Sequence, residues 1–118
     1  MKSSATIKPV YVTDTHTLLW YLKQDPKLSS SAMEIFRAAE HGETRIVVSV
    51  IVIAELYYLN KRQKFFESFV KLYADLKTKP YFQLLALEPD DILNFDTDAA
   101  VPEMHDRIIT GLARRLGA

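Results

Sequence analysis

Three acidic side chains, Asp14, Glu55 and Asp106, stand at positions where carboxylates could act together. Asp14 follows a short β-branched and aromatic stretch and precedes a helical apolar pattern, so it marks a strand-to-helix junction. Glu55 lies inside the apolar segment 50–59, and Asp106 lies at the start of the last helical pattern. In open α/β sheets, ligands bind in the crevice outside the carboxyl ends of the strands. The three acids are therefore candidate members of one site at that edge of a sheet.

Three carboxylates at one sheet edge would repel one another, and a divalent cation relieves this repulsion. Oxygen-only ligands select magnesium or manganese rather than zinc. Such ions act on phosphodiesters, because they lower the pKa of a bound water and clamp the attacking and leaving oxygens. The sequence therefore predicts a Mg²⁺ or Mn²⁺ site that serves phosphodiester hydrolysis.

Each acid also has a simpler interpretation. Asp14 is an N-cap residue by type and position. Glu55 needs a partner if its helix is buried, and a salt bridge or one exposed edge of the helix would satisfy it. Asp106 lies in a first helical turn, where the helix dipole favours an acid. One acid alone is weak evidence, so the prediction depends on the three together.

The apolar pattern alternates strands with helices, which predicts an α/β fold, a parallel sheet with helices on both faces. The apolar run 46–54 also fits one long strand, but a switch to helix at Ser49 suits the helix-favouring residues that follow it. We expect strands at residues 10–13, 44–48 and 81–87, and helices at residues 15–23, 50–60, 89–95 and 105–116. A further helix is capped by Ser29, Ser30 or Ser31 and stops at Gly42, and a long helix runs from residue 65 until Lys79-Pro80 ends it. This order places the three acids near the starts of three helices.

Composition and charge limit the class of protein. Residues 1–118 are assigned to one domain, long enough for its own core, with a loose leader at residues 1–8. The absence of cysteine excludes disulfides, thiolate chemistry and cysteine-based zinc sites. Neither a signal peptide nor an apolar run of membrane length is found, so we expect a cytoplasmic protein without a membrane span.

Net charge is zero, yet the charges are unevenly distributed. Most of the charged residues in segment 61–79 are Lys or Arg. All the charged residues in segment 88–106 are Asp or Glu. Such blocks are usually solvated surfaces, and we expect this for most of these residues. Aromatic pairs occur at 20–21, 57–58 and 65–66. Core packing is the expected role, although only part of each pair can point inward, and a partner groove or dimer face is the alternative.

Three segments carry the candidate acids in a recurring context. They read Val-Thr-Asp-Thr-His-Thr-Leu-Leu-Trp at 12–20, Ser-Val-Ile-Val-Ile-Ala-Glu-Leu at 49–56 and Met-His-Asp-Arg-Ile-Ile at 104–109. Their order, spacing and element context resemble the three successive motifs of the PIN-domain nucleases, and are most similar to the VapC-type toxins of bacterial toxin–antitoxin pairs. The resemblance runs from residue 10 to the end of the chain.

This resemblance implies a Rossmann-like PIN fold and a magnesium- or manganese-dependent endoribonuclease that cuts structured RNA such as tRNA or rRNA. It implies a cognate antitoxin whose tail enters the groove near the acids. By the same resemblance Asp14, Glu55 and Asp106 are catalytic metal ligands, and Thr15 supports the site through its hydroxyl. Arg107 is a candidate for holding substrate phosphate, with a surface salt bridge as the alternative.

Two histidines lie beside the candidate acids and need a separate assignment. His16 and His105 adjoin acids, but neither has a second His at ligand spacing, so we assign both to the rim or to packing. The family pattern implies a further strand that bears a fourth acid or polar ligand after the helix that ends at Gly117. We expect a homodimer or a partner to cover that side. A non-catalytic PIN-like module that binds a partner protein or RNA is the alternative function, and DNA is the alternative substrate because acids do not specify the sugar.

Other enzyme classes fit less well. Haloacid-dehalogenase-like phosphatases need a second Asp two residues after the first, and His16 occupies that position. Barrel metallohydrolases need a His pair and a far longer chain. The glycines Gly42, Gly111 and Gly117 are too far apart to form a phosphate-binding loop for a nucleotide.

Overall fold

The computed structural model describes residues 8–92 and 104–117. The expected leader lies outside this part apart from Lys8, and the assignment of residues 1–118 to one domain stays a prediction. The elements follow in the order β1 (Val10–Val12), α1 (Thr15–Lys23), α2 (Ser30–Glu40), β2 (Arg45–Ser49), α3 (Val50–Gln63), α4 (Phe69–Thr78), β3 (Phe82–Leu85), the 3₁₀ helix η2 (Pro89–Ile92) and α5 (Met104–Leu116).

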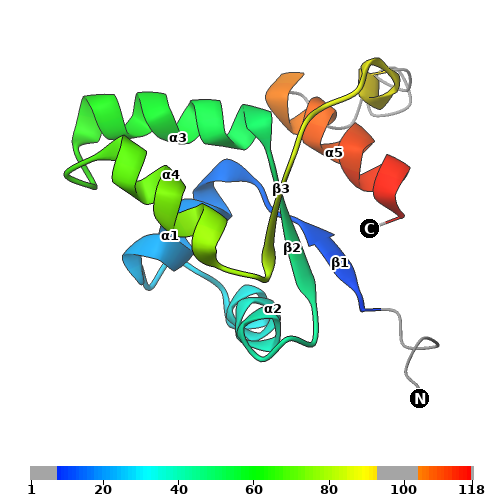
Figure 1. Ribbon diagram of the computed structural model, residues 1–118, viewed down its shortest axis with the longest axis horizontal. Helices are drawn as coiled ribbons and strands as arrows, with labels where there is room; N and C mark the ends of the chain where they lie inside the picture. Colours follow the sequence, from blue (N-terminus) through cyan, green and yellow to red (C-terminus); the bar gives the residue numbers. More distant parts are fainter. Residues whose placement is uncertain (1–7, 93–103, 118) are drawn as a thin grey trace.

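The three strands form a parallel sheet in the order β1-β2-β3, which confirms the predicted α/β architecture. The register pairs Tyr11 with Ile46 and Val47 with Gln83, so β2 is the central strand. In Figure 1, α3 and α4 lie to the left of the sheet and α5 to its right, so helices cover both faces. A strand covered on both faces has consecutive apolar residues, as β2 has at residues 46–48, which are all buried.

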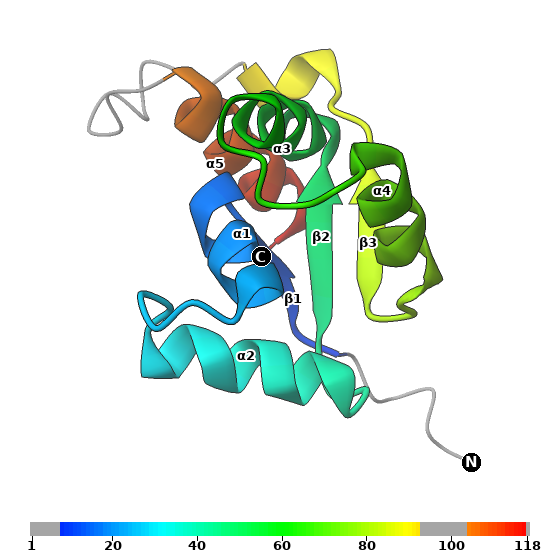
Figure 2. The ribbon, with the colours of Figure 1, turned by 90° about the vertical axis from the view of Figure 1, so that its left-hand side faces the viewer.

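The core forms where the inner faces of the helices meet β2. Leu18 of α1, Val48 of β2, and Val52 and Leu56 of α3 are almost fully buried and belong to one cluster. Figure 2 looks onto the face of the sheet that α1 and α4 cover, with α1 in front of β1, α4 in front of β3 and α5 on the far side. Within the part of the chain that the structure describes, no helix is long and apolar enough to cross a membrane.

Ser49 ends β2 and caps α3, which confirms the predicted switch from strand to helix within the apolar run. Its Oγ accepts a hydrogen bond from the backbone N–H of Val52 at 3.4 Å, and Ser49 is fully buried. The helix therefore starts at the carboxyl end of the central strand. Glu55 lies in its second turn, at the edge of the sheet where the site was predicted.

Two helix boundaries were predicted wrongly. α3 continues to Gln63, and α4 starts at Phe69 rather than at residue 65. The reason is local hydrogen bonding, because Ser68 Oγ accepts from the Lys71 N–H at 3.2 Å and caps α4. The preceding turn is held by Asn60, whose Oδ1 accepts from the Phe66 N–H at 2.7 Å.

The segment after β3 differs from the predicted helix 89–95. It forms the 3₁₀ helix η2 at Pro89–Ile92, and residues 93–95 lie outside the described part. η2 contacts α5 backbone to backbone at Gly111, where an added Cβ would lie 1.7 Å from the carbonyl oxygen of Asp91. α5 ends as predicted, because Gly117 adopts a positive φ of 69° after the last helical turn.

Candidate active site

Asp14 lies at the carboxyl end of β1, between this strand and α1. Its Oδ1 accepts a hydrogen bond from the Thr17 N–H at 2.8 Å, so it is the N-cap of α1. The preceding residue, Thr13, is held to β2 through a 3.1 Å hydrogen bond from its N–H to the carbonyl oxygen of Val47. Asp14 is exposed, and the cap uses only one of its oxygens. Helix capping and cation binding are therefore compatible at this residue.

Glu55 is tied to the start of α1 by a hydrogen bond. The Oγ1 of Thr15 donates to Glu55 Oε1 at 2.5 Å, and Thr15 itself is only 5% exposed. Hydrogen bonds to an ionised acceptor are roughly twice as strong as neutral ones. This contact joins α3 to α1 and holds the half-buried Glu55 carboxylate against the residue that follows Asp14. The geometry thus brings two of the three predicted acids to one place.

The third acid is placed only through its helix. Asp106 is in the first turn of α5, and its side chain lies outside the described part, as do those of His105 and Arg107. α5 packs against β1, and its N-terminal part lies beside the start of α3 in both Figure 1 and Figure 2. The helix that carries Asp106 therefore starts near the helices that carry Asp14 and Glu55.

The donor chemistry of these residues fits a hard cation. Asp14, Glu55 and Thr15 offer only oxygen atoms, which suits Mg²⁺ or Mn²⁺. His16 is exposed, and its ring lies 6.1 Å from that of Trp20, which agrees with a packing role. Among the side chains that the structure describes, no three His, Cys, Asp or Glu residues gather as metal ligands. A complete ligand set therefore needs a further acid, and Asp106 is the candidate from α5.

Asp91 is a buried charge, an exception to the solvated surface expected for most acids of the block at residues 88–106. Its carboxylate is fully buried and accepts hydrogen bonds from Arg115 Nε at 2.7 Å and from the Glu88 N–H at 2.8 Å. Burial alone would raise the pKa of Asp91, but the hydrogen bonds from Arg115 and Glu88 and the charge of Arg115 outweigh it and lower the pKa. The pair Asp91–Arg115 fastens η2 to α5.

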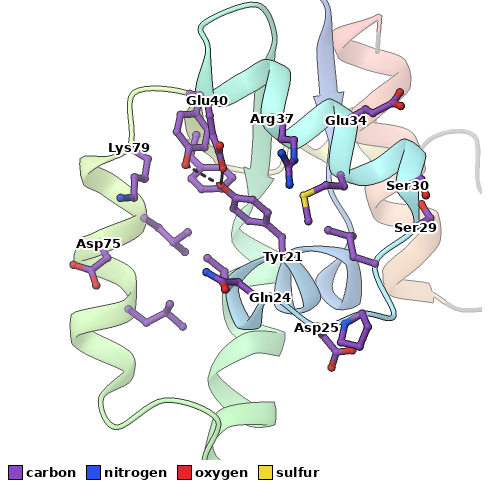
Figure 3. A pocket seen from close by; sticks show the side chains of 18 residues that line it. Tyr21, Gln24, Asp25, Ser29, Ser30, Glu34, Arg37, Glu40, Asp75 and Lys79 are labelled. Carbon is purple, nitrogen blue, oxygen red and sulfur yellow. Dashed lines mark hydrogen bonds between the residues drawn. The ribbon is translucent and has the colours of Figure 1, made fainter.

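A wide cleft in the described residues has neither Asp14 nor Glu55 in its lining. It has a volume of about 1180 Å³ and is lined mainly by α2, α4 and the end of α1. Figure 3 shows Tyr21 in this cleft, with its hydroxyl directed at Glu40 and at the Tyr81 hydroxyl, 3.1 Å away. Burial, together with these hydrogen bonds, raises the pKa of Tyr21, so its hydroxyl remains a protonated donor. The cleft contains side chains that can form hydrogen bonds, whereas the candidate metal ligands Asp14 and Glu55 lie at the carboxyl edge of the sheet.

Comparison with known proteins identifies the family. The PIN-domain model matches residues 11–117, a range that includes all three candidate acids. No curated protein and no solved structure gives a significant match to the chain. The PIN domain is a nuclease-type fold, and PIN domains generally act as nucleases and typically use divalent metals. Because the match covers most of its length, the chain belongs to the PIN-domain family.

Proposed function

We propose that this protein is a Mg²⁺- or Mn²⁺-dependent endoribonuclease and the toxin of a VapC-type toxin–antitoxin pair in the cytoplasm. Its substrate would be a structured RNA of the tRNA or rRNA class. A cognate antitoxin would silence it by entering the groove near the acids, and a homodimer would be its assembled form. The observation that carries the proposal is the hydrogen bond from Thr15 to Glu55, which draws two acids from distant segments together at the carboxyl edge of the sheet.

Asp14, Glu55 and Asp106 would hold the cation, and each has a separate structural support. Asp14 caps α1, Glu55 accepts a hydrogen bond from Thr15, and Asp106 belongs to α5, which the Asp91–Arg115 pair fastens to η2. When bound, Mg²⁺ or Mn²⁺ would lower the pKa of the attacking water and neutralise charge on the phosphodiester. Thr15 keeps the Glu55 carboxylate oriented, and Arg107 would contact a substrate phosphate. The three acids together would form an acidic edge against which a phosphodiester is positioned.

The test is cleavage of labelled tRNA and rRNA fragments by the purified chain with Mn²⁺ or Mg²⁺, with chelator, and with the Asp14→Asn variant. We expect cutting that needs the metal and is abolished by Asp14→Asn. Asn is as good an N-cap as Asp, so this variant keeps α1 capped and changes mainly the charge. Asp25→Asn, in the turn after the same helix, is the matched control and should cut like the parent.

The alternative function, a PIN-like module that only binds, makes the opposite prediction. It requires partner or RNA binding that survives chelator and the substitution Glu55→Gln, without metal-dependent cutting by the parent. Equal cutting by the parent and by Asp14→Asn would contradict the nuclease mechanism itself. The result with single-stranded DNA under the same conditions decides between RNA and DNA as the substrate.

A further inference from the structure

We propose that the outer face of α3 guides single-stranded RNA away from the acidic edge, with Tyr58 stacking on a base and Arg62 contacting a phosphate. This inference rests on the proposed nuclease function, because it starts from Glu55. Residues at i, i+3 and i+7 share one face of a helix, and Glu55, Tyr58 and Arg62 have this spacing. Tyr58 and Arg62 lie about 4.5 Å and about 10.5 Å beyond Glu55 along the helix axis, a reach of a few nucleotides.

Tyr58 is an exposed aromatic ring held in place by its neighbours. It is 61% exposed, the most exposed aromatic residue among those described. Its ring meets that of Tyr57 edge to face at 5.1 Å, and Tyr57 packs in the same way on Phe69 of α4 at 5.3 Å. Tyr58 is therefore the member of its aromatic pair that does not pack in the core. A fixed, exposed ring is suited to base stacking, which does not depend on sequence and contributes about 1–3 kcal/mol per base.

The direction of this face links it to the candidate site. Glu55 points toward α1, where it meets Thr15, whereas Tyr57 points toward α4, where it meets Phe69. Figure 2 looks along α3 and shows α1 and α5 on one side of it and α4 on the other. The face of Glu55, Tyr58 and Arg62 therefore runs along the side of α3 nearer to α1 and α5, continuous with the acidic edge.

The charge along this face is complementary to a nucleic-acid backbone. Arg62 gives this face a positive charge, and Lys61 follows on the neighbouring side of α3, where its Nζ lies 5.9 Å from the centre of the Tyr57 ring. Arg62 is exposed and forms no ion pair within the described part of the chain. An aromatic platform beside basic side chains, running from a phosphodiester-cutting site, fits an RNA strand better than a protein partner.

The test is binding of a fluorescein-labelled, 2′-O-methylated single-stranded RNA, measured by fluorescence anisotropy in chelator. This probe resists cutting, so binding is measured apart from catalysis. We expect Tyr58→Ala to weaken binding about tenfold and Tyr58→Phe to preserve it within about twofold, because stacking needs the ring. Arg62→Gln should weaken binding. It should also make the slope of log affinity against log salt concentration shallower by about 0.7, the value for one phosphate contact on a single strand.

Tyr73→Ala is the matched control, because Tyr73 is an exposed tyrosine on α4 away from this face. Equal RNA binding by the parent, Tyr58→Ala and Tyr73→Ala would overturn the inference. This is the result expected if the face binds a protein partner instead of RNA. The two proposals fail separately. Binding that depends on Tyr58 in a protein that cuts no RNA would leave the RNA surface standing and end the nuclease proposal. Metal-dependent cutting and RNA binding that are both unaffected by Tyr58→Ala would support the nuclease proposal and end the proposal of an RNA surface on α3.

Discussion

At the scale of single residues, Thr15 is the contact that decides the geometry of the site. Thr15→Val removes the hydroxyl but keeps the shape, so Glu55 loses the donor that orients it. Partners that orient metal ligands typically contribute 10- to 100-fold to metal affinity or activity. We therefore expect Thr15→Val to raise the Mn²⁺ concentration needed for half-maximal cleavage about tenfold or more, measured by titrating the metal in the RNA cleavage assay.

The control is Thr17→Val in the same helix, since only the backbone N–H of Thr17 contacts the site. If both valine variants needed the same metal concentration as the parent, Thr15 would have no part in orienting Glu55. A loss of cleavage that added Mn²⁺ did not restore would point instead to a disturbed fold.

The residue scale also shows what the sequence could predict about the site. Asp14 could be found because strand, acid and helix follow one another directly. Its N-cap interpretation is confirmed, and its role as a metal ligand stays a prediction. The partner of Glu55 was not predictable as Thr15, because the contact joins residues 40 positions apart. Asp91 was missed because a buried acid in an acidic block is indistinguishable from its solvated neighbours until Arg115 is placed beside it.

At the scale of elements, η2 and α5 act as one unit because the Asp91–Arg115 pair and the close contact at Gly111 join them. Removing one partner of a buried ion pair costs about 3–5 kcal/mol, and Arg115 is partly exposed, so we expect the lower end of this range. Arg115→Gln should therefore lower the free energy of unfolding by about 3 kcal/mol at neutral pH, measured by urea unfolding. The exposed substitution Arg37→Gln should change it by less than about 0.5 kcal/mol.

The pH dependence of this contribution has a definite sign. The folded pKa of Asp91 lies below its ordinary value, so the pair contributes fully above about pH 4 and its contribution is lost as the pH falls through the folded pKa. The destabilisation by Arg115→Gln should accordingly shrink in acid. A difference between parent and variant that grew on acidification would contradict this assignment of charge.

At the scale of elements, local sequence determines some helix and strand boundaries and leaves others undetermined. Strand-to-helix order, the cap at Ser49 and the stop at Gly117 follow from local propensity and were predicted. The start of α4 was not, because Phe65 and Phe66 continue its helical spacing although they pack from a turn. Periodicity reports which side chains are buried, and hydrogen bonds such as that of Ser68 decide where the helix begins.

At the scale of the whole molecule, the candidate site joins segments that are far apart in the chain, so a cation bound there should stabilise the entire fold. A ligand that binds only the folded state adds about 2.7 kcal/mol at a concentration of 100 times its Kd. For a domain of this length, 1 kcal/mol raises Tm by roughly 4 °C, so near-saturating Mn²⁺ should raise Tm by about 10 °C. The measurement is thermal unfolding followed by circular dichroism, with Mn²⁺ and with chelator.

The same measurement on two variants tests where the cation binds. Asp14→Asn should lose most of the Mn²⁺-dependent rise in Tm, because it removes a charged ligand while preserving the cap of α1. Asp25→Asn should keep the full rise, because Asp25 bonds to Lys23 and to the Lys27 N–H at the other end of the helix. An equal rise in the parent and in Asp14→Asn would mean that Mn²⁺ binds elsewhere on the acidic surface. A rise specific to Asp14 places the cation at the edge where β1, α3 and α5 meet, and so ties the stability of the fold to its metal.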